Sequence, residues 1–245
     1  MTDYARYLES LYGEKTLERK LAYLDHNFGT YLAEGQTALE IGPGLGEFCA
    51  VASRRGLQVD VIDRDEAVLR HVKSRYRIRA SWCTPAESVP SLDGALPSYD
   101  RIVMVQVLEH VELSSLVPLM GFLFRHLNPG GKLLATVPNG ATPLGGVERY
   151  WDITHRTAFS ANSLRQLVHM AGLTGRCSVE VEGFRIPPVS AVNVARIVAQ
   201  KLLHAGLLAV MVANGGVYER LFHPNITLVL TRLDESPGSH SVEDD

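Results

Sequence analysis

The stretch ALEIGPGLGEF, residues 38–48, decides the fold of this 245-residue chain. An apolar run at residues 37–41 ends in a loop that has glycine at alternate positions, Gly42, Gly44 and Gly46. Glycine is needed where a Cβ would collide with a ligand, or where the backbone takes a positive φ. A strand followed by such a loop predicts a ligand site beyond the carboxyl end of a parallel sheet.

The chain after this loop alternates between strand and helix patterns. Four further apolar runs, separated by stretches of helical periodicity, occupy residues 57–63, 78–83, 99–105 and 131–138. This alternation predicts a parallel sheet covered by helices on both faces. The Pro-Gly-Gly turn just before residue 132 is expected to separate a helix from the fifth strand. Residues 177–184 and 225–233 alternate like antiparallel edge strands, which makes seven strands in all.

Three segments flank or interrupt this α/β pattern. Residues 1–34 have helical periodicity and predict an N-terminal helical cap, so the main domain is expected over 35–233. A helical insertion is expected at 185–224, and an acidic tail at 234–245 is expected to be disordered.

The apolar helix predicted in the insertion, residues 192–212, has one polar stripe. Four side chains at helical spacing form it: Asn193, Arg196, Gln200 and His204. Because the helix has few positive charges, we expect a lid or a dimer contact rather than a membrane-surface helix.

Composition excludes several classes of protein. The net charge of -3 and pI near 6.3 provide no basic field, which disfavours a nucleic-acid binder. The three cysteines are odd in number and far apart, so neither a disulfide framework nor a cysteine zinc site is expected. The N-terminus lacks a signal-peptide pattern, and no uncharged run has transmembrane length. These features predict a soluble, cytoplasmic protein.

The glycine loop departs from the dinucleotide-binding fingerprint. That fingerprint is GxGxxG, whereas this loop is GxGxG and has Glu47 where the last glycine should stand. Glu47 would repel a pyrophosphate, and Glu40 adds a second carboxylate that faces the same region. Two carboxylates suit a ligand with a cationic amino-acid head group, a description that matches S-adenosylmethionine.

An acidic residue ends the second strand. Asp63 lies 21 positions after Gly42, where a carboxylate can accept hydrogen bonds from both ribose hydroxyls. The same feature would fit NAD equally well. A purely structural alternative is that Asp63 only caps the helix that follows.

Four motifs together resemble those of class I S-adenosylmethionine-dependent methyltransferases, in order and at the usual spacing. They are LEIGPGLGEF (39–48), VDVIDRD (59–65), YDRIVMVQVLEHV (99–111) and LNPGGKLLATVPN (127–139). The resemblance covers residues 37–175. Within the superfamily, VLEHV and the segment at 152–173 are similar to the small-molecule O-methyltransferase branch, which includes ubiquinone-biosynthesis and glycan-cluster enzymes.

The resemblance implies a fold and a donor site. The fold is a doubly wound, Rossmann-like α/β structure with a seven-stranded, mostly parallel sheet and an antiparallel C-terminal hairpin. The implied donor-binding residues are Glu40, Gly42, Gly44, Gly46, Asp63, Arg64 and Gln106. Many relatives have an aspartate after the third strand that binds the adenine amine, but here Pro85 takes that place. Adenine is therefore expected at the Ala86 amide or at Glu87.

Methyl transfer to a hydroxyl needs a positioned acceptor and a base. Base candidates follow the fourth strand (Glu109 and His110) and the fifth strand (Asp152 and His155). His155 lies three residues after Asp152, so one turn would let the carboxylate orient the imidazole. This pair suits a catalytic base and a structural brace equally.

No metal site is expected. The family pattern sometimes has a further acid three residues before Glu109, but Gln106 stands there. One carboxylate and one imidazole are too few ligands for magnesium. The seven remaining histidines have no partner pattern and are expected at the surface: His26, His71, His126, His169, His204, His223 and His240.

The function expected from these features is S-adenosylmethionine-dependent O-methylation of a small molecule or of a sugar or glycan precursor. One alternative is a catalytically silent domain that binds S-adenosylmethionine and regulates or scaffolds a partner. The other is an NAD-dependent oxidoreductase, which the missing third glycine weakens. We expect no nucleic-acid or membrane partner, and a homodimer is left open. The acceptor pocket has no sequence code.

Overall fold

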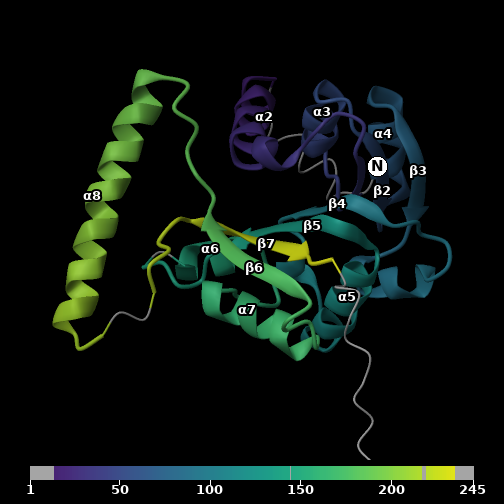
Figure 1. Cartoon of the computed structure of the whole chain (residues 1–245). Helices are drawn as coiled ribbons and strands as arrows, with labels where there is room; N and C mark the ends of the chain where they lie inside the picture. The colour runs from purple at the N-terminus through teal and green to yellow at the C-terminus, as the bar shows by residue number, and fades with distance from the viewer. Residues whose placement is uncertain (1–13, 144, 217–218, 235–245) are drawn as a thin grey trace, which may run out of the picture.

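The computed structural model describes residues 14–143, 145–216 and 219–234. One seven-stranded sheet organises the chain, in the order β3-β2-β1-β4-β5-β7-β6 (Figure 1). The strands are β1 (Thr37–Ile41), β2 (Gln58–Asp63), β3 (Ile78–Cys83), β4 (Tyr99–Val105), β5 (Leu127–Pro138), β6 (Cys177–Gly183) and β7 (Asn225–Arg232). Strands β1 to β5 are parallel, and β7 is antiparallel to both β5 and β6. The predicted fold class is confirmed.

Helices cover both faces of the sheet and create two hydrophobic cores. Along β1 the side chains alternate, so Ala38 joins one core while Leu39 and Ile41 join the other. The first core contains α2 (Glu14–Phe28), α3 (Glu47–Arg54) and α4 (Glu66–Arg75). The second contains the 3-10 helix η2 (Ala86–Leu92), α5 (Leu113–Arg125) and α7 (Ala161–Met170). This two-sided packing is the doubly wound arrangement.

The fifth strand begins earlier than the sequence predicts. Strand β5 starts at Leu127, before the Pro-Gly-Gly turn, because that turn forms an irregularity within the strand. Tyr99 pairs with Leu127 and Arg101 with Lys132, so β5 accommodates extra residues opposite β4. Gly130 has φ +71, which only glycine adopts readily. The expected start at residue 131 is therefore wrong.

The flanking segments are described in part. In the expected cap, 1–34, the structure shows α2, which packs against α3, and a short 3-10 helix, η1 (Gly29–Tyr31). Residues 1–13 of that cap and 235–245 of the expected disordered tail lie outside the described residues. The insertion forms α8 (Ala191–Ala213), which stands apart from the rest of the molecule in Figure 1.

The carboxyl ends of the parallel strands meet at one edge of the sheet, where doubly wound folds bind ligands. The loops that follow β1, β2, β4 and β5 emerge there. Strand β6 runs parallel to β5, because both are antiparallel to β7. The insertion that follows Gly183 therefore leaves from this same ligand-binding edge.

Candidate active site

The glycine loop after β1 is closely covered by neighbouring side chains. All three glycines have positive φ, +73 at Gly42, +55 at Gly44 and +88 at Gly46. A Cβ on Gly42 would lie 2.6 Å from Val107 Cγ2, and one on Gly46 would lie 2.5 Å from the Tyr76 ring. Because both contacts are shorter than van der Waals distance, this cradle accepts only glycine at these positions. The contact with Val107 joins the loop to the segment that follows β4.

Two carboxylates lie beside the loop, as the sequence predicts, but in different environments. Glu47, in the first turn of α3, forms a salt bridge with Lys20, in which Lys20 Nζ lies 2.8 Å from Glu47 Oε1. Glu40 is only 3% exposed and accepts a 2.9 Å hydrogen bond from the Cys49 thiol. Burial, with a smaller effect from the charge of Glu47, raises the pKa of Glu40 to about 8. A cationic group beside Glu40 would favour its charged form.

The structure separates the roles of two aspartates after β2. Asp65 is the N-cap of α4, since its side chain accepts a 2.8 Å hydrogen bond from the Ala67 amide. Asp63 ends β2 at the ligand-binding edge, and its Oδ1 accepts from the Asp65 amide at 2.8 Å. Burial raises the pKa of Asp63. The capping role considered for Asp63 therefore belongs to Asp65.

Three of the predicted catalytic residues come together across 46 residues of sequence. Glu109 and His110 belong to the 3-10 helix η3 (Leu108–His110), and His155 follows α6 (Gly145–Trp151). The backbone oxygen of Glu109 accepts from the amides of Arg156 (2.7 Å) and Thr157 (3.1 Å). These bonds place the His155 segment against η3, so that the His110 and His155 ring centroids are 4.8 Å apart.

Burial sets the protonation of this cluster. Glu109 is 1% exposed, and neither of its carboxyl oxygens has a hydrogen-bond partner among the described residues. Burial raises the pKa of Glu109 to about 8, with a smaller contribution from the charge of Asp152. For His110, burial and then the charge of His155 lower the pKa. At neutral pH, Glu109 is thus protonated and His110 is a neutral imidazole.

Asp152 acts on the cluster through Thr154. Its Oδ1 accepts hydrogen bonds from the Thr154 hydroxyl (2.6 Å) and amide (2.8 Å). The Thr154 hydroxyl also lies 2.9 Å from His110 Nδ1. Burial opposes the charge of Asp152, but these bonds and the two nearby histidines lower its pKa overall. The predicted turn is present, since the His155 amide donates to the Asp152 carbonyl at 3.2 Å.

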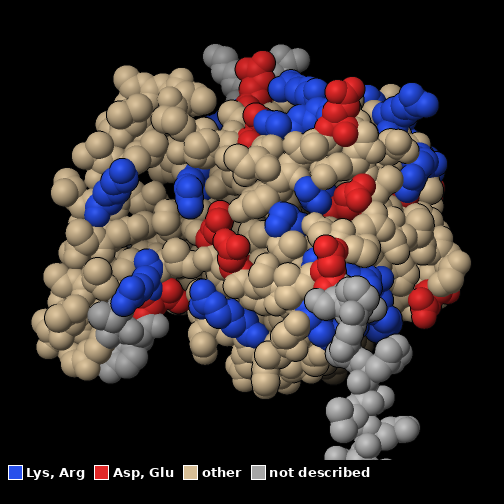
Figure 2. All heavy atoms as spheres, viewed as in Figure 1, with Lys and Arg blue, Asp and Glu red and all other residues tan. Residues whose placement is uncertain are grey.

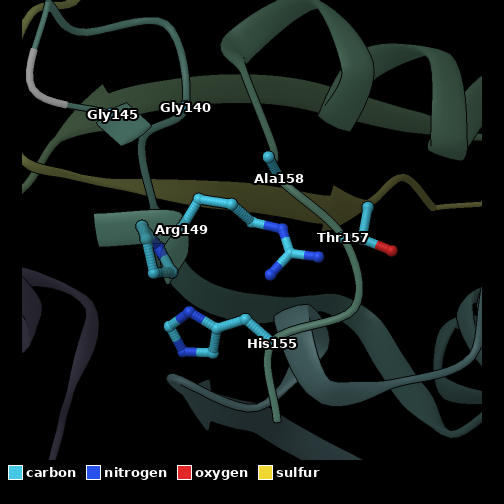
Figure 3. Close-up of a pocket in the computed structure, with 7 residues that line it drawn as sticks. Gly140, Gly145, Arg149, His155, Thr157 and Ala158 are labelled. Carbon is cyan, nitrogen blue, oxygen red and sulfur yellow. The ribbon is translucent and has the colours of Figure 1, made fainter. Parts of the chain in front are cut away.

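A small pocket lies beside His155 (Figure 3). The end of β5, the start of α6 and the segment after His155 form its walls, with the lining residues Pro138, Gly140, Gly145, Arg149, His155, Thr157 and Ala158. In Figure 3 the Arg149 guanidinium lies between Thr157 and His155. Its Nη2 donates a 3.3 Å hydrogen bond to the Arg156 carbonyl. The pocket thus presents a cation next to the candidate base.

The remaining predicted donor residues lie around the same edge. Gln106 is the one described non-glycine residue with positive φ (+57), and its Nε2 donates to Asn225 Oδ1 at 2.9 Å. Arg64 is exposed after β2, and its charge contributes to the lowered pKa of His110. Ala86 and Glu87 begin η2 after β3, both partly buried. Left-handed backbone at a side chain as large as Gln106 is typical of functional sites.

Sequence reasoning missed two polar residues that shape this edge. Thr154 connects Asp152 to His110, and no spacing rule indicates such a bridge. Asn139, fully buried after β5, donates through Nδ2 to the carbonyls of Leu221 (2.6 Å) and His223 (3.0 Å). The signal available for Asn139 was its place just after an apolar strand.

Four of the histidines expected at the surface are not exposed: His126 is buried, and His71, His204 and His223 are partly buried. His126 is 8% exposed, lies 3.0 Å from the Phe122 carbonyl through Nδ1 and stacks on the Phe122 ring. His223 packs against Gly183, where a Cβ would lie 2.0 Å from its Nδ1. Burial lowers the pKa of His223 to about 4. The expectation failed because packing partners distant in sequence leave no local pattern.

The cluster also bears on metal binding. Ligand atoms of Glu109, His110 and His155 all lie within 4.8 Å of one another. Sequence reasoning counted only the first two. Two imidazoles and one carboxylate form a donor set suited to transition metals rather than to magnesium, which prefers oxygen. A metal would also have to displace the proton on Glu109.

The raised pKa values predict a pH-dependent stability. Between the ordinary carboxyl pKa of 4.5 and about 8, the folded state keeps protons on Glu40 and Glu109 that the unfolded state releases. The free energy of unfolding therefore falls as pH rises, by up to about 1.4 kcal/mol per pH unit for each group. Urea unfolding between pH 5.5 and 8 should show this slope, and Glu109→Gln should reduce it. The exposed Glu34→Gln variant is the control, and equal slopes for wild type and Glu109→Gln would contradict the assignment.

Comparisons with known proteins identify the family of this chain. The family model for the methyltransferase domain matches residues 8–178. A "Probable S-adenosylmethionine-dependent methyltransferase" of Mycolicibacterium smegmatis is 32% identical over 139 residues, 56% of this chain. The chain spans about half the length of that curated relative, since the match covers 52% of it.

Solved structures share the fold. An S-adenosylmethionine-dependent methyltransferase from Archaeoglobus fulgidus superposes with a TM-score of 0.67 at 16% identity, covering 94% of this chain and all of that one. The N-methyltransferase NodS of Bradyrhizobium japonicum, in complex with S-adenosyl-L-homocysteine, gives 0.54 at 14% identity, covering 91% and 89% of the two chains. Identity this low supports the fold alone. On the family match, which extends over more than half of its residues, this chain belongs to the methyltransferase-domain family of class I S-adenosylmethionine-dependent methyltransferases.

Proposed function

We propose that the chain methylates a hydroxyl oxygen of a small molecule or of a sugar or glycan precursor, with S-adenosylmethionine as the donor. The observation that carries this proposal is the pair of imidazoles, 4.8 Å apart at the ligand-binding edge, of which His110 is kept neutral by burial. A hydroxyl acceptor must lose a proton during transfer, whereas a neutral amine is already nucleophilic. A neutral imidazole is the side chain best suited to accept that proton near pH 7.

The donor site follows from the cradle. Side chains fill the space beside Gly42 and Gly46, whereas at Gly44 the nearest atom to a Cβ would be Glu47 Oε2 at 3.5 Å, so a ligand can approach the backbone closely at Gly44. In the proposed arrangement Asp63 accepts hydrogen bonds from the ribose hydroxyls, and Glu40 and Glu47 face the cationic amino-acid end. The start of η2, Ala86 and Glu87, is assigned to the adenine.

Catalysis needs alignment and a proton acceptor. When bound, S-adenosylmethionine supplies a methyl group on a sulfonium and leaves as a neutral thioether. The chain must hold the acceptor oxygen in line with that methyl group. We assign His155 as the group that takes the hydroxyl proton on a ring nitrogen. Asp152 and Thr154 hold the adjacent His110. In this assignment they also stabilise the positive charge that develops on His155 when it takes the proton.

Exposed apolar side chains next to His155 support an acceptor with a flat or apolar face. Tyr150 and Trp151 are each 81% exposed and Ile153 is 97% exposed, all within five residues of His155. Large exposed side chains grouped beside a candidate base are typical of a binding surface. Aromatic rings stack on sugars and on planar rings. Arg149 in the pocket adds a group that would attract an anionic substituent.

Replacing His155 tests the base assignment. A panel of matched hydroxyl, amine and thiol acceptors, scored by formation of S-adenosylhomocysteine, should first single out a hydroxyl compound. With that acceptor, His155→Ala is expected to lower kcat by about 100-fold or more, with donor affinity nearly unchanged, because only a transition-state interaction is lost. Asp152→Asn should cause a smaller loss in the same direction.

His169→Ala is the matched control, because His169 lies near the end of α7, on the opposite edge of the sheet, and bonds Thr174. A near-normal kcat in His155→Ala would refute the assignment and make His110 the residue to test. Preferred methylation of the amine analogue would refute the proposed acceptor class.

Activity is expected not to require magnesium. An imidazole that accepts a proton cannot at the same time donate its lone pair to a metal, and protonated Glu109 is no ligand. Initial rates measured in excess chelator should equal those of the untreated enzyme, and added magnesium should not raise them. Loss of activity in chelator with recovery on adding a divalent ion would show that the cluster holds a metal.

A further inference from the structure

Helix α8 turns Asn193, Gln200 and His204 toward the protein and most of its large apolar side chains outward. The less exposed positions recur at helical spacing on one side, at Asn193, Ile197, Gln200, His204, Leu207 and Met211. The opposite and lateral positions are exposed by 53–70%: Val192, Val198, Leu202, Leu203, Val210 and Val212. The other exposed positions hold alanine, glycine, Val194, Leu208 and the charged Arg196 and Lys201, so Arg196 lies outside the inward-facing stripe. Soluble proteins place such a helix the other way round.

Specific contacts fix this orientation. Ser190 caps α8 by accepting a 3.1 Å hydrogen bond from the Asn193 amide, and Asn193 Nδ2 donates to the Pro187 carbonyl at 2.7 Å. The His204 ring contacts the rings of Phe222 (5.7 Å between centroids) and His223 (4.8 Å). Since the polar side chains are used by the fold, the apolar face cannot turn inward without breaking these contacts.

We propose that this outward face docks on the surface of an anionic phospholipid bilayer. Helix α8 has two charged side chains, Arg196 and Lys201, both exposed, and no acidic one. Arg185 and Arg220 flank it, and Glu219 is turned onto the backbone amides of Arg220 and Leu221. Figure 2 shows this side as mostly uncharged, with isolated blue side chains and some red beside the lower of them.

Charge distinguishes a bilayer from a second copy of the chain. Two α8 faces pressed together would bring like charges near one another at both flanks. An anionic surface attracts each lysine or arginine by about 1 kcal/mol instead, while the apolar face enters the lipid boundary. Sequence analysis favoured a lid or an oligomer contact, because the positive charges are few. The structure adds the outward apolar face, which supplies the larger part of the binding.

The connections of α8 show that it lies on the membrane and does not cross it. Its length, about 35 Å for 23 residues, and its composition would suffice to cross a hydrocarbon core of about 30 Å. Arg196 and Lys201 interrupt the apolar residues, so the sequence of α8 contains no uncharged run of transmembrane length. However, Gly183 and Ile226 are paired neighbours in the sheet. The chain between α8 and β7, whose described residues 214–216 and 219–224 form no helix, would have to recross the bilayer, and a hydrocarbon environment forbids non-helical backbone exposed to lipid.

Docking through α8 would bring the active site to the bilayer surface. The insertion leaves from the ligand-binding edge, and its returning segment is bonded there, through Asn139 to Leu221 and through Asn225 to Gln106. An acceptor carried by the membrane could then reach His155 without leaving the bilayer. This consequence for the acceptor rests on the proposed function, whereas membrane binding itself does not.

Co-sedimentation of the full chain with vesicles tests the proposal. Wild type should bind vesicles of equimolar phosphatidylglycerol and phosphatidylcholine, and bind pure phosphatidylcholine more weakly. Leu202→Glu and Val198→Glu should each weaken binding to the anionic vesicles by about tenfold or more, since a charge replaces buried apolar area. Met170→Glu is the matched control, because Met170 is 60% exposed near the opposite edge of the sheet and should leave binding unchanged.

Three results would overturn the proposal: no binding of wild type to anionic vesicles, equal binding by Leu202→Glu, or a dimer in solution that Leu202→Glu dissociates without any vesicle binding. The last result would assign the face to a second copy of the chain. Binding of S-adenosylhomocysteine by each variant, measured without vesicles, should equal that of wild type. This control separates failure of the membrane proposal from failure of the methyl-transfer proposal, and circular dichroism verifies that each variant is folded.

Discussion

The close contact between the glycine loop and its neighbours is the constraint on which the site depends. Gly42 and Gly46 hold left-handed backbone with no room for a Cβ, against Val107 on one side and Tyr76 on the other. Because Val107 leads directly into η3, the packing that shapes the cradle also positions Glu109 and His110. The central place of β1, between β2 and β4, makes this contact geometrically available. Donor cradle and base cluster are therefore parts of one packing arrangement.

The buried carboxyl groups divide into two kinds. Asp60, 1% exposed on β2, is fully engaged by Arg79 (3.0 and 2.6 Å), the Tyr99 hydroxyl (2.9 Å) and the Ala80 amide (2.9 Å). Among the described residues, the carboxyl group of Glu40 has one hydrogen-bond donor, the Cys49 thiol, and the carboxyl group of Glu109 has none. An unsatisfied buried carboxyl costs stability. Glu40 and Glu109 both lie near the ligand-binding edge, which fits a functional role for them. Asp60, with its full set of partners, stabilises the sheet.

The sequence predicted most of the fold, because apolar runs and glycine loops leave local signals. It failed at β5, where the Pro-Gly-Gly segment is absorbed as a bulge, since pairing with β4 outweighs local turn preference. The proximity of His110 and His155 could not be predicted, because backbone bonds from Arg156 and Thr157 to Glu109 create it. The orientation of α8 could not be predicted either, because contacts between residues distant in sequence decide it. A stripe of polar residues is visible in sequence, but which way it faces depends on contacts at Phe222 and His223.

The central claim is that the cradle and Asp63 hold S-adenosylmethionine and its product. Calorimetric titration with S-adenosylhomocysteine tests it most directly, with Asp65→Asn as a control that retains the α4 cap. The account predicts that Asp63→Ala weakens binding by about tenfold or more, equivalent to about 1.4 kcal/mol, while Asp65→Asn binds like wild type. Undiminished affinity in Asp63→Ala would contradict the account and remove Asp63 from the donor site.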